Sequence, residues 1–242
     1  MAETVSERAK EVTANIESAR HRIAAACTAA GRSVTDVTIV AVTKTYPASD
    51  VRLLAEAGIT EVAENRDQEA GDKAEQCRDL DLTWHFVGQL QTNKARSVAR
   101  YADVVHSVDR GKLVRALGAG ARLHGREITS LVQVNLDPAS AEGVLGPRGG
   151  ADPRDVLDVA GAIEDEEGLV LGGVMAVAPR TGDPAAAFGR LAAVAERVRD
   201  RYPQATMISA GMSGDLEAAI ARGATHLRLG TALLGERKVI VG

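Results

Sequence analysis

Aromatic residues, long apolar runs and a strong net charge are all missing from this chain, and each absence excludes a class of partner. Aromatic residues make up 2% of the 242 residues, too few for a platform on which single-stranded nucleic acid stacks. The formal net charge of -4 gives no basic footprint for nucleic acid. No segment approaches the roughly 18 uninterrupted apolar residues of a membrane-spanning helix. We therefore expect neither nucleic acid nor membrane as a partner.

Metal-binding and nucleotide-binding motifs are also lacking. The two cysteines, Cys27 and Cys77, form no Cys-x-x-Cys pair and have no histidine at zinc spacing. His21, His106 and His124 show no mutual spacing typical of a metal site. No P-loop and no Gly-x-Gly-x-x-Gly motif follows an apolar run, which disfavours a nucleotide ligand. The charged N-terminus has no apolar signal-peptide core, so we expect a cytoplasmic protein with two free thiols.

What the chain does contain is a regular alternation of apolar runs and amphipathic segments. The first thirty residues have apolar positions at helical spacing, and Gly31 supplies a stop. Eight short apolar runs follow, at residues 37–42, 59–63, 82–87, 104–107, 128–134, 169–175, 206–209 and 225–229. Helical segments are expected to begin near Ala48, Arg66, Thr92, Arg110, Pro153, Pro184 and Ser213, with a last short one after Gly230.

This alternation predicts right-handed βαβ units and a parallel sheet. Most runs are continuously apolar, as expected of strands that are covered on both faces. Eight repeats favour an α/β fold, a single (β/α)8 TIM-type barrel over residues 1–242, with the helix of residues 1–30 packed on it. An open, doubly wound sheet is the competing arrangement. The stretch 137–152, rich in proline and glycine, is expected to be a long loop after the fifth strand.

Lys44 follows the first apolar run directly, where a barrel strand leaves the core. Functional groups of such barrels gather at these carboxyl ends, and a lysine amine that is kept unprotonated there forms imines with aldehydes. The alternative is a solvated lysine at a strand end.

The segments after the seventh and eighth strands have the residues that a phosphate site requires. Barrels bind phosphate at these two loops with backbone amides and a helix N-terminus. Glycines let the backbone approach an anion, and serine and threonine add hydroxyl donors. The residues concerned are Ser209, Gly211, Ser213, Gly214, Gly230 and Thr231. Ordinary helix caps after tight turns are the alternative interpretation.

Three further polar residues lie within or at the ends of predicted strands. Arg228 has apolar neighbours, and an arginine that faces the core needs a partner or a ligand; facing outward, it would be a surface charge. Asn65 ends the second strand and offers its amide to a ligand or caps the next helix. His85 is polar within an apolar strand, where a histidine held by a backbone hydrogen bond is commoner than a catalytic base.

Taken together, these residues resemble the YggS/PROSC family of pyridoxal phosphate homeostasis proteins, whose barrel is similar to the N-terminal domain of alanine racemase. The resemblance covers residues 38–235. It is carried by five strings, at residues 40–44 (VAVTK), 64–65 (EN), 84–94 (WHFVGQLQTNK), 209–220 (SAGMSGDLEAAI) and 228–235 (RLGTALLG).

The resemblance implies a covalent aldimine of pyridoxal 5′-phosphate (PLP) at Lys44, with Asn65 and His85 among the cofactor-binding residues. It implies that the phosphate is surrounded by the two loops, at Ser209, Gly211, Met212, Ser213, Gly230 and Thr231, and that Arg228 approaches the pyridine nitrogen. The family's Gly-Glu-Asn is here Ala63-Glu64-Asn65, followed by Arg66-Asp67 where Tyr-Val is usual. The family's basic residue after the fifth strand has no clear counterpart, and Arg148 is the best candidate.

By this resemblance the expected function is non-catalytic: the protein holds PLP, takes part in vitamin B6 homeostasis, and passes PLP to apo-enzymes by transient contact. Related B6 vitamers are further expected ligands, and a monomer is the expected state. A racemase-like enzyme is the alternative, but such racemases take a tyrosine base from a second domain, for which we expect no sequence here. A sugar-phosphate barrel with Lys44 as an aldolase-like amine is a third possibility.

Overall fold

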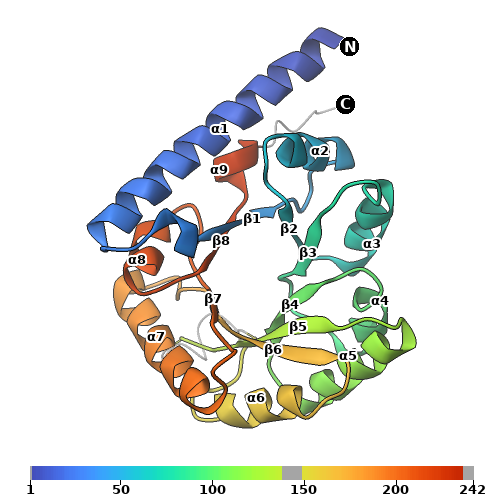
Figure 1. The fold of residues 1–242 in the computed structure, drawn as a ribbon, viewed down its shortest axis with the longest axis vertical. Coiled ribbons are helices and arrows are strands. Elements are labelled where there is room, and N and C mark those ends of the chain that lie inside the picture. Colours follow the sequence, from blue (N-terminus) through green and yellow to red (C-terminus); the bar gives the residue numbers. More distant parts are fainter. Residues whose placement is uncertain (1, 138–148, 237–242) are drawn as a thin grey trace.

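The chain forms a closed barrel of eight parallel strands surrounded by helices (Figure 1). The computed structural model describes residues 2–137 and 149–236. The strands follow one another around the barrel in chain order, and β8 closes it by pairing with β1. The predicted (β/α)8 barrel is therefore confirmed, and the open sheet is excluded.

The strands coincide with the eight apolar runs to within about two residues. Most residues within the strands are valine, isoleucine, leucine and alanine. These suit a strand with one face toward the inside of the barrel and the other against the helices. Their bounds are β1 Thr38–Val42, β2 Glu61–Glu64, β3 Thr83–Phe86, β4 Val104–Val108, β5 Ile128–Gln133, β6 Leu169–Met175, β7 Met207–Ser209 and β8 His226–Leu229.

A helix follows each strand and begins within about three residues of the expected position. They are α2 Ala48–Glu56, α3 Asp67–Gln76, α4 Ala95–Val98, α5 Gly111–Leu123, α6 Val156–Glu164, α7 Pro184–Arg201, α8 Leu216–Ala221 and α9 Thr231–Leu234, with short 3-10 turns at Val34–Asp36 and Thr92–Lys94. Helix α7 shows how sequence sets a start: Asp183 accepts the N–H groups of Ala185 and Ala186, and Pro184 occupies the first helical position. None of the described helices has the length and apolarity needed to cross a membrane.

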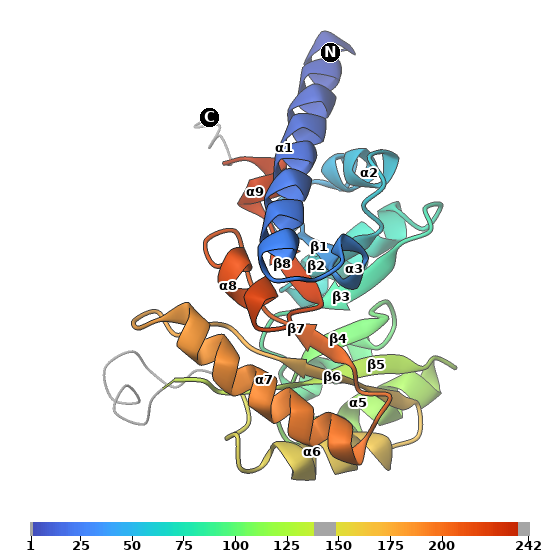
Figure 2. The same ribbon diagram turned by 60° about the vertical axis from the view of Figure 1, so that its left-hand side comes forward.

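The first helix, α1 (Ala2–Ala29), precedes the barrel and lies along its outside against α8 and α9 (Figures 1 and 2). Val12, Ile16, Ile23 and Cys27 form its buried face. Two polar side chains tie it to α9: Asn15 donates to the carbonyl of Leu233 at 3.2 Å, and Arg8 donates to the carbonyl of Leu234 at 2.9 Å. Helix α1 thus fixes the helix that follows the eighth strand.

Apolar side chains form two separate clusters. The larger one fills the space between the strands and the helices and includes both cysteines, which are buried and unbridged. The smaller one comprises Val104, Leu131 and Met175 on successive strands, and the alternation of side chains along a strand places it inside the barrel. The rest of the interior includes polar and charged groups, which bear on the site.

Candidate functional site

The predicted site residues follow or end five neighbouring strands of the barrel. Because all eight strands are parallel, their carboxyl ends open at one face. Around this face the order is β7, β8, β1, β2 and β3. These strands carry, in that order, Ser209 with the Gly211–Ser213 segment, Arg228 with Gly230 and Thr231, then Lys44, Asn65 and His85. Residues far apart in the chain are thereby brought to one arc of the barrel.

Lys44 occupies a tight turn immediately after β1 and is exposed. Among the described residues that are not glycine, only Thr45 has a positive φ, 70°, a strained conformation for a β-branched residue. Strain of this kind persists where surrounding contacts enforce it, and here the Thr45 N–H donates to Glu69 Oε1 at 2.7 Å. No hydrogen bond or ion pair with any described residue engages the Lys44 amine.

A buried ion pair lies beneath this turn. Lys73 of α3 donates to Glu64 Oε1 at 2.5 Å and to the carbonyl of Thr43 at 2.8 Å, and the Thr43 hydroxyl donates to the same carboxylate oxygen at 2.6 Å. Burial raises the pKa of Glu64, and the hydrogen bonds from Lys73 and Thr43 offset only part of this effect. The cluster joins the ends of β1 and β2. It therefore fixes the backbone next to Lys44 and Asn65.

Sequence reasoning did not find Lys73, although a signal was present. Ala70, Lys73 and Cys77 recur at i, i+3 and i+7, the spacing of a buried helix face, and all three are buried. A lysine in such a stripe needs a buried acidic partner, which Glu64 provides.

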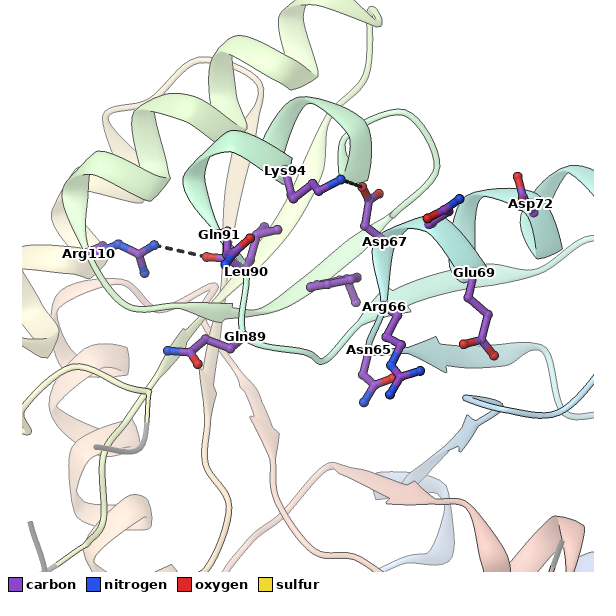
Figure 3. Close-up of a pocket in the computed structure, with 12 residues that line it drawn as sticks. Asn65, Arg66, Asp67, Glu69, Asp72, Gln89, Leu90, Gln91, Lys94 and Arg110 are labelled. Atoms are coloured by element: carbon purple, nitrogen blue, oxygen red, sulfur yellow. Dashed lines mark hydrogen bonds and ion pairs between the residues drawn. The ribbon is translucent and has the colours of Figure 1, made fainter. Parts of the chain in front are cut away.

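Asn65 borders a cleft of about 810 Å³ beside the barrel mouth (Figure 3). Its side-chain oxygen is buried and has no hydrogen-bond partner among the described residues, an arrangement that costs free energy unless a ligand or water supplies a donor. Its backbone is held by the loop after β3, where a Cβ on Gly88 would lie 2.2 Å from the Asn65 carbonyl oxygen. Only glycine permits this approach.

The walls of this cleft are polar and of mixed charge. Lys94 extends toward Asp67, 3.8 Å away, and Arg110 donates to the carbonyl of Leu90 at 3.2 Å (Figure 3). Arg66 is exposed at the start of α3 beside Asn65, so the Arg66-Asp67 departure from the family pattern lies in the cleft wall.

The loop after β7 is held in a conformation that requires glycine. Gly211 has φ 92°, and a Cβ there would lie 2.7 Å from the side chain of Ala219. The exposed Met212 donates its N–H to Asp215 Oδ1 at 2.6 Å, whereas no described acceptor faces the N–H groups of Ser213 or Gly214. These free amides are suited to an anion.

One detail of this loop corrects the sequence analysis. Helix α8 begins at Leu216 with Asp215 as its N-cap, so Ser213 lies in the preceding turn and does not start the helix. Three residues separate the expected start from the observed one, because the Asp215 carboxylate takes the N–H of Met212 and organises the turn.

The loop after β8 is as predicted: α9 begins at Thr231, with Gly230 as N-cap. The first N–H groups of a helix lack partners within it. The N–H of Arg228 donates to the carbonyl of Gly211 at 3.0 Å, and Gly230 lies against Val42 of β1. The two loops and the Lys44 strand therefore adjoin one another.

Arg228 is 5% exposed, so the outward, surface-charge alternative is wrong. It donates to Ser209 Oγ at 2.6 Å and to the carbonyl of Ala176 at 2.9 Å. Burial lowers its pKa to about 10, and the side chain remains a cation at neutral pH.

His85 lies inside the barrel, where both its ring nitrogens are engaged by side chains rather than by the backbone. One ring nitrogen, Nδ1, is 2.7 Å from His106 Nε2, and the other, Nε2, is 2.5 Å from Glu61 Oε2. His106 in turn reaches Ser209 at 2.9 Å. That His85 and Ser209 contact a cofactor stays a prediction. Sequence reasoning missed His106 and Glu61, which lie on different strands from His85.

Two expectations from the sequence, the role of Arg148 and the long loop 137–152, stay predictions. Arg148 lies outside the described residues, as does most of the 137–152 stretch. Within the described residues, no cluster of histidine, cysteine and carboxylate side chains could hold a metal ion.

Comparisons with known proteins agree with this fold. Residues 14–238 match the family model described as "Alanine racemase, N-terminal domain". The pyridoxal phosphate homeostasis protein of Mycobacterium tuberculosis is 40% identical over 96% of this chain and 95% of its own length.

Solved structures show the same relationship. The structure of PipY from Synechococcus elongatus with PLP bound has a TM-score of 0.78 and 32% identity, covering 93% of this chain and all of that one. An alanine racemase of Clostridium difficile shares the fold alone, with a TM-score of 0.72 and 14% identity, covering 96% of this chain and 58% of the racemase.

Proposed function

Because the chain belongs to the family of pyridoxal phosphate homeostasis proteins, with the barrel of the alanine racemase N-terminal domain, we propose that it binds PLP at this arc and serves PLP homeostasis without catalytic turnover. The observation that carries the proposal is the convergence at one barrel face of an unengaged lysine, two amide-rich loops and a buried arginine. PipY is a structural neighbour with PLP bound.

Lys44 is the residue proposed to hold the cofactor as a Schiff base. Its amine would hold the aldehyde carbon of the cofactor as an imine, so that the reactive aldehyde is stored. Lys44 is exposed and has no ionic partner among the described residues, which suits a lysine that must bind and release the cofactor.

The loops after β7 and β8 are proposed to bind the phosphate. The N–H groups of Ser213 and Gly214 and those of the first turn of α9 supply donors, and the Ser213 and Thr231 hydroxyls add to them. A Cβ on Gly214 would meet no atom within 4 Å, so the space beside this backbone is open to a ligand. Gly230 and Met212 border the same region.

Arg228 bears on whether bound PLP would react. Arginine donates hydrogen bonds and accepts none, so beside the pyridine nitrogen it favours the unprotonated ring. An unprotonated ring is a weaker electron sink for carbanions. A weaker electron sink stabilises a substrate carbanion less, which favours storage over carbanion chemistry. Asn65, with its unsatisfied oxygen, would lie at the cofactor's edge.

The tyrosines give the racemase alternative little support. Tyr46 lies near Lys44, but its hydroxyl donates to the carbonyl of Gly235 at 2.7 Å. Tyr101 is buried, and burial raises the pKa of its hydroxyl. Transfer of PLP to apo-enzymes by transient contact, by a monomeric and cytoplasmic protein, completes the proposal.

A transfer assay tests this function. PLP-loaded protein is mixed with an apo PLP enzyme in the presence of a phosphatase that destroys free PLP. The proposal predicts faster or fuller activation of the enzyme than by the same amount of free PLP, and no advantage for Lys44→Ala. It predicts no α-proton exchange of L-alanine in deuterium oxide; exchange that requires Lys44 would establish a racemase-like enzyme instead.

A further inference from the structure

A continuous chain of hydrogen-bonded side chains crosses the interior of the barrel. It runs from Arg228 to Ser209 (2.6 Å), His106 (2.9 Å), His85 (2.7 Å) and Glu61 (2.5 Å). The four links join residues of β8, β7, β4, β3 and β2. His85, His106, Ser209 and Arg228 are each at most 5% exposed. Buried polar groups need hydrogen-bond partners, and these side chains provide partners for one another.

With both histidine rings neutral and Glu61 ionised, the chemistry of the two ends sets the direction of every link. Arg228 can only donate, so Ser209 Oγ accepts from it and directs its own proton to His106 Nδ1. His106 Nε2 must then carry the ring's proton and donate to His85 Nδ1. His85 Nε2 carries the proton of its ring and donates to the carboxylate of Glu61. All four hydrogen bonds point from the cation toward the anion, an arrangement in which each bond polarises the next.

The surroundings of the chain agree with this protonation pattern. Burial lowers the pKa of His106 well below its ordinary value, and the nearby charge of Arg228 acts in the same direction. A neutral His106 can accept at one nitrogen and donate at the other, as the chain requires. Burial would raise the pKa of Glu61, but hydrogen bonds from His85 and Thr83 act against it, and the net effect lowers the carboxyl pKa, so that Glu61 is ionised.

We propose that Glu61, His85 and His106 are positioning residues for the cofactor: they hold Ser209 and, through it, the guanidinium of Arg228 against the ring nitrogen. This role rests on the proposed function. It assigns a part in cofactor binding to Glu61 and His106, neither of which the sequence analysis predicted to contact the cofactor. It also commits the Ser209 proton to His106, so that Ser209 meets a ligand as an acceptor only.

The histidine tautomers test the chain in the protein without PLP. Nitrogen NMR of histidine-labelled protein at neutral pH separates the two neutral tautomers and the charged ring. We expect His85 and His106 both to carry their proton on Nε2, with Nδ1 bare. A proton on Nδ1 of either ring would overturn the proposed chain, and the measurement needs no substitution that could unfold the protein.

Substitutions at His106 test the positioning role. His106→Leu removes the acceptor for Ser209 and should weaken PLP binding about tenfold, as the loss of a buried hydrogen-bond partner implies, and shift the absorbance maximum of bound PLP. His106→Asn keeps an oxygen that can accept from Ser209 and should recover most of the affinity. His124→Leu, at an exposed histidine, is the matched control and should bind within about twofold of wild type.

The outcomes separate the two proposals. Wild-type protein that binds no PLP would overturn the proposed function and with it this role. PLP binding by wild type that is equally tight in His106→Leu, with an unchanged spectrum, would overturn the positioning role alone. If His106→Leu does not fold, a Glu61→Gln variant with the PLP affinity and absorbance spectrum of wild type, together with a proton on Nδ1 of either ring, would do the same.

Discussion

Lys73 is the one buried lysine among the described residues, and it forms an ion pair with a buried carboxylate. Its ammonium and the Glu64 carboxylate are 6% and 0% exposed and lie 2.5 Å apart. Removing one member of a buried pair leaves the other charge without compensation, which is far more costly than losing an exposed pair.

Lys73→Met is therefore expected to lower the free energy of unfolding by about 3 to 5 kcal/mol. Lys94→Met is the matched control: its ammonium is half exposed and 3.8 Å from Asp67, so it should cost less than about 1 kcal/mol. Urea denaturation of both variants measures the difference. Similar values for the two lysines would contradict the importance given to the buried pair.

Gly211 and Gly214 lie in one loop but differ in what their backbone tolerates. Gly211→Ala forces a side chain into a positive φ and against Ala219 and Leu227, and should cost about 2 to 4 kcal/mol. Gly214→Ala meets no neighbour and should change the free energy of unfolding by less than about 0.5 kcal/mol. Thermal and urea unfolding check this; an equally stable Gly211→Ala would contradict the assigned loop conformation.

At the residue scale, sequence identified groups at strand ends better than groups inside the barrel. Lys44 and Asn65 follow an apolar run and Arg228 lies within one, so the position of each could be inferred from a single segment. The hydrogen-bond partners of His106 and Glu61 lie on other strands. The register that aligns these strands cannot be read from the sequence of any single strand.

At the element scale, α1 matters because it holds α9. Ile16 is 1% exposed on the buried face of α1, between Val12 and Ala19, and the same helix donates from Asn15 to α9. A weakened α1 would therefore loosen the helix that begins at Thr231 in the proposed phosphate site.

Ile16→Ala should cost about 2 to 5 kcal/mol through lost burial and a cavity. The adjacent, exposed Glu17→Ala is the control and should stay within about 0.5 kcal/mol of wild type. Chemical denaturation compares the two, and PLP titration of Ile16→Ala shows whether the phosphate loop responds. An unchanged stability would mean that α1 is not packed on the barrel as described.

The helices and strands were largely predictable, because in this chain the spacing of apolar residues changes where glycines and prolines mark the ends of elements. Continuous apolar runs gave all eight strands, and Gly31 and Pro184 marked the end of α1 and the start of α7. The start of α8 was misplaced because both Ser213 and Asp215 are favourable N-caps, and only the contact between Met212 and Asp215 distinguishes them.

At the scale of the whole molecule, buried histidines should make the fold sensitive to acid. Burial lowers the pKa of His226 to about 4 and that of His106 well below 6.5. Below pH 6.5 both histidines become protonated in the unfolded chain but stay neutral in the folded one. The free energy of unfolding therefore falls as the pH falls.

Between pH 7.5 and pH 5.0 the expected loss is about 2 kcal/mol per histidine. Urea denaturation at the two pH values measures it, and His226→Gln should remove about half of the loss while His124→Gln leaves it unchanged. A free energy of unfolding that is constant over this range would show that the two rings are not held neutral.

The assignment of Lys44 as the cofactor lysine is tested most directly by trapping. Protein incubated with PLP is reduced with borohydride, which converts an imine to a stable secondary amine, and the intact mass and its fragments are measured. We predict one phosphopyridoxyl group per chain, located on Lys44, retained in Lys94→Ala and absent from Lys44→Ala. No adduct on wild type, or an adduct spread over other lysines that persists in Lys44→Ala, would contradict the assignment.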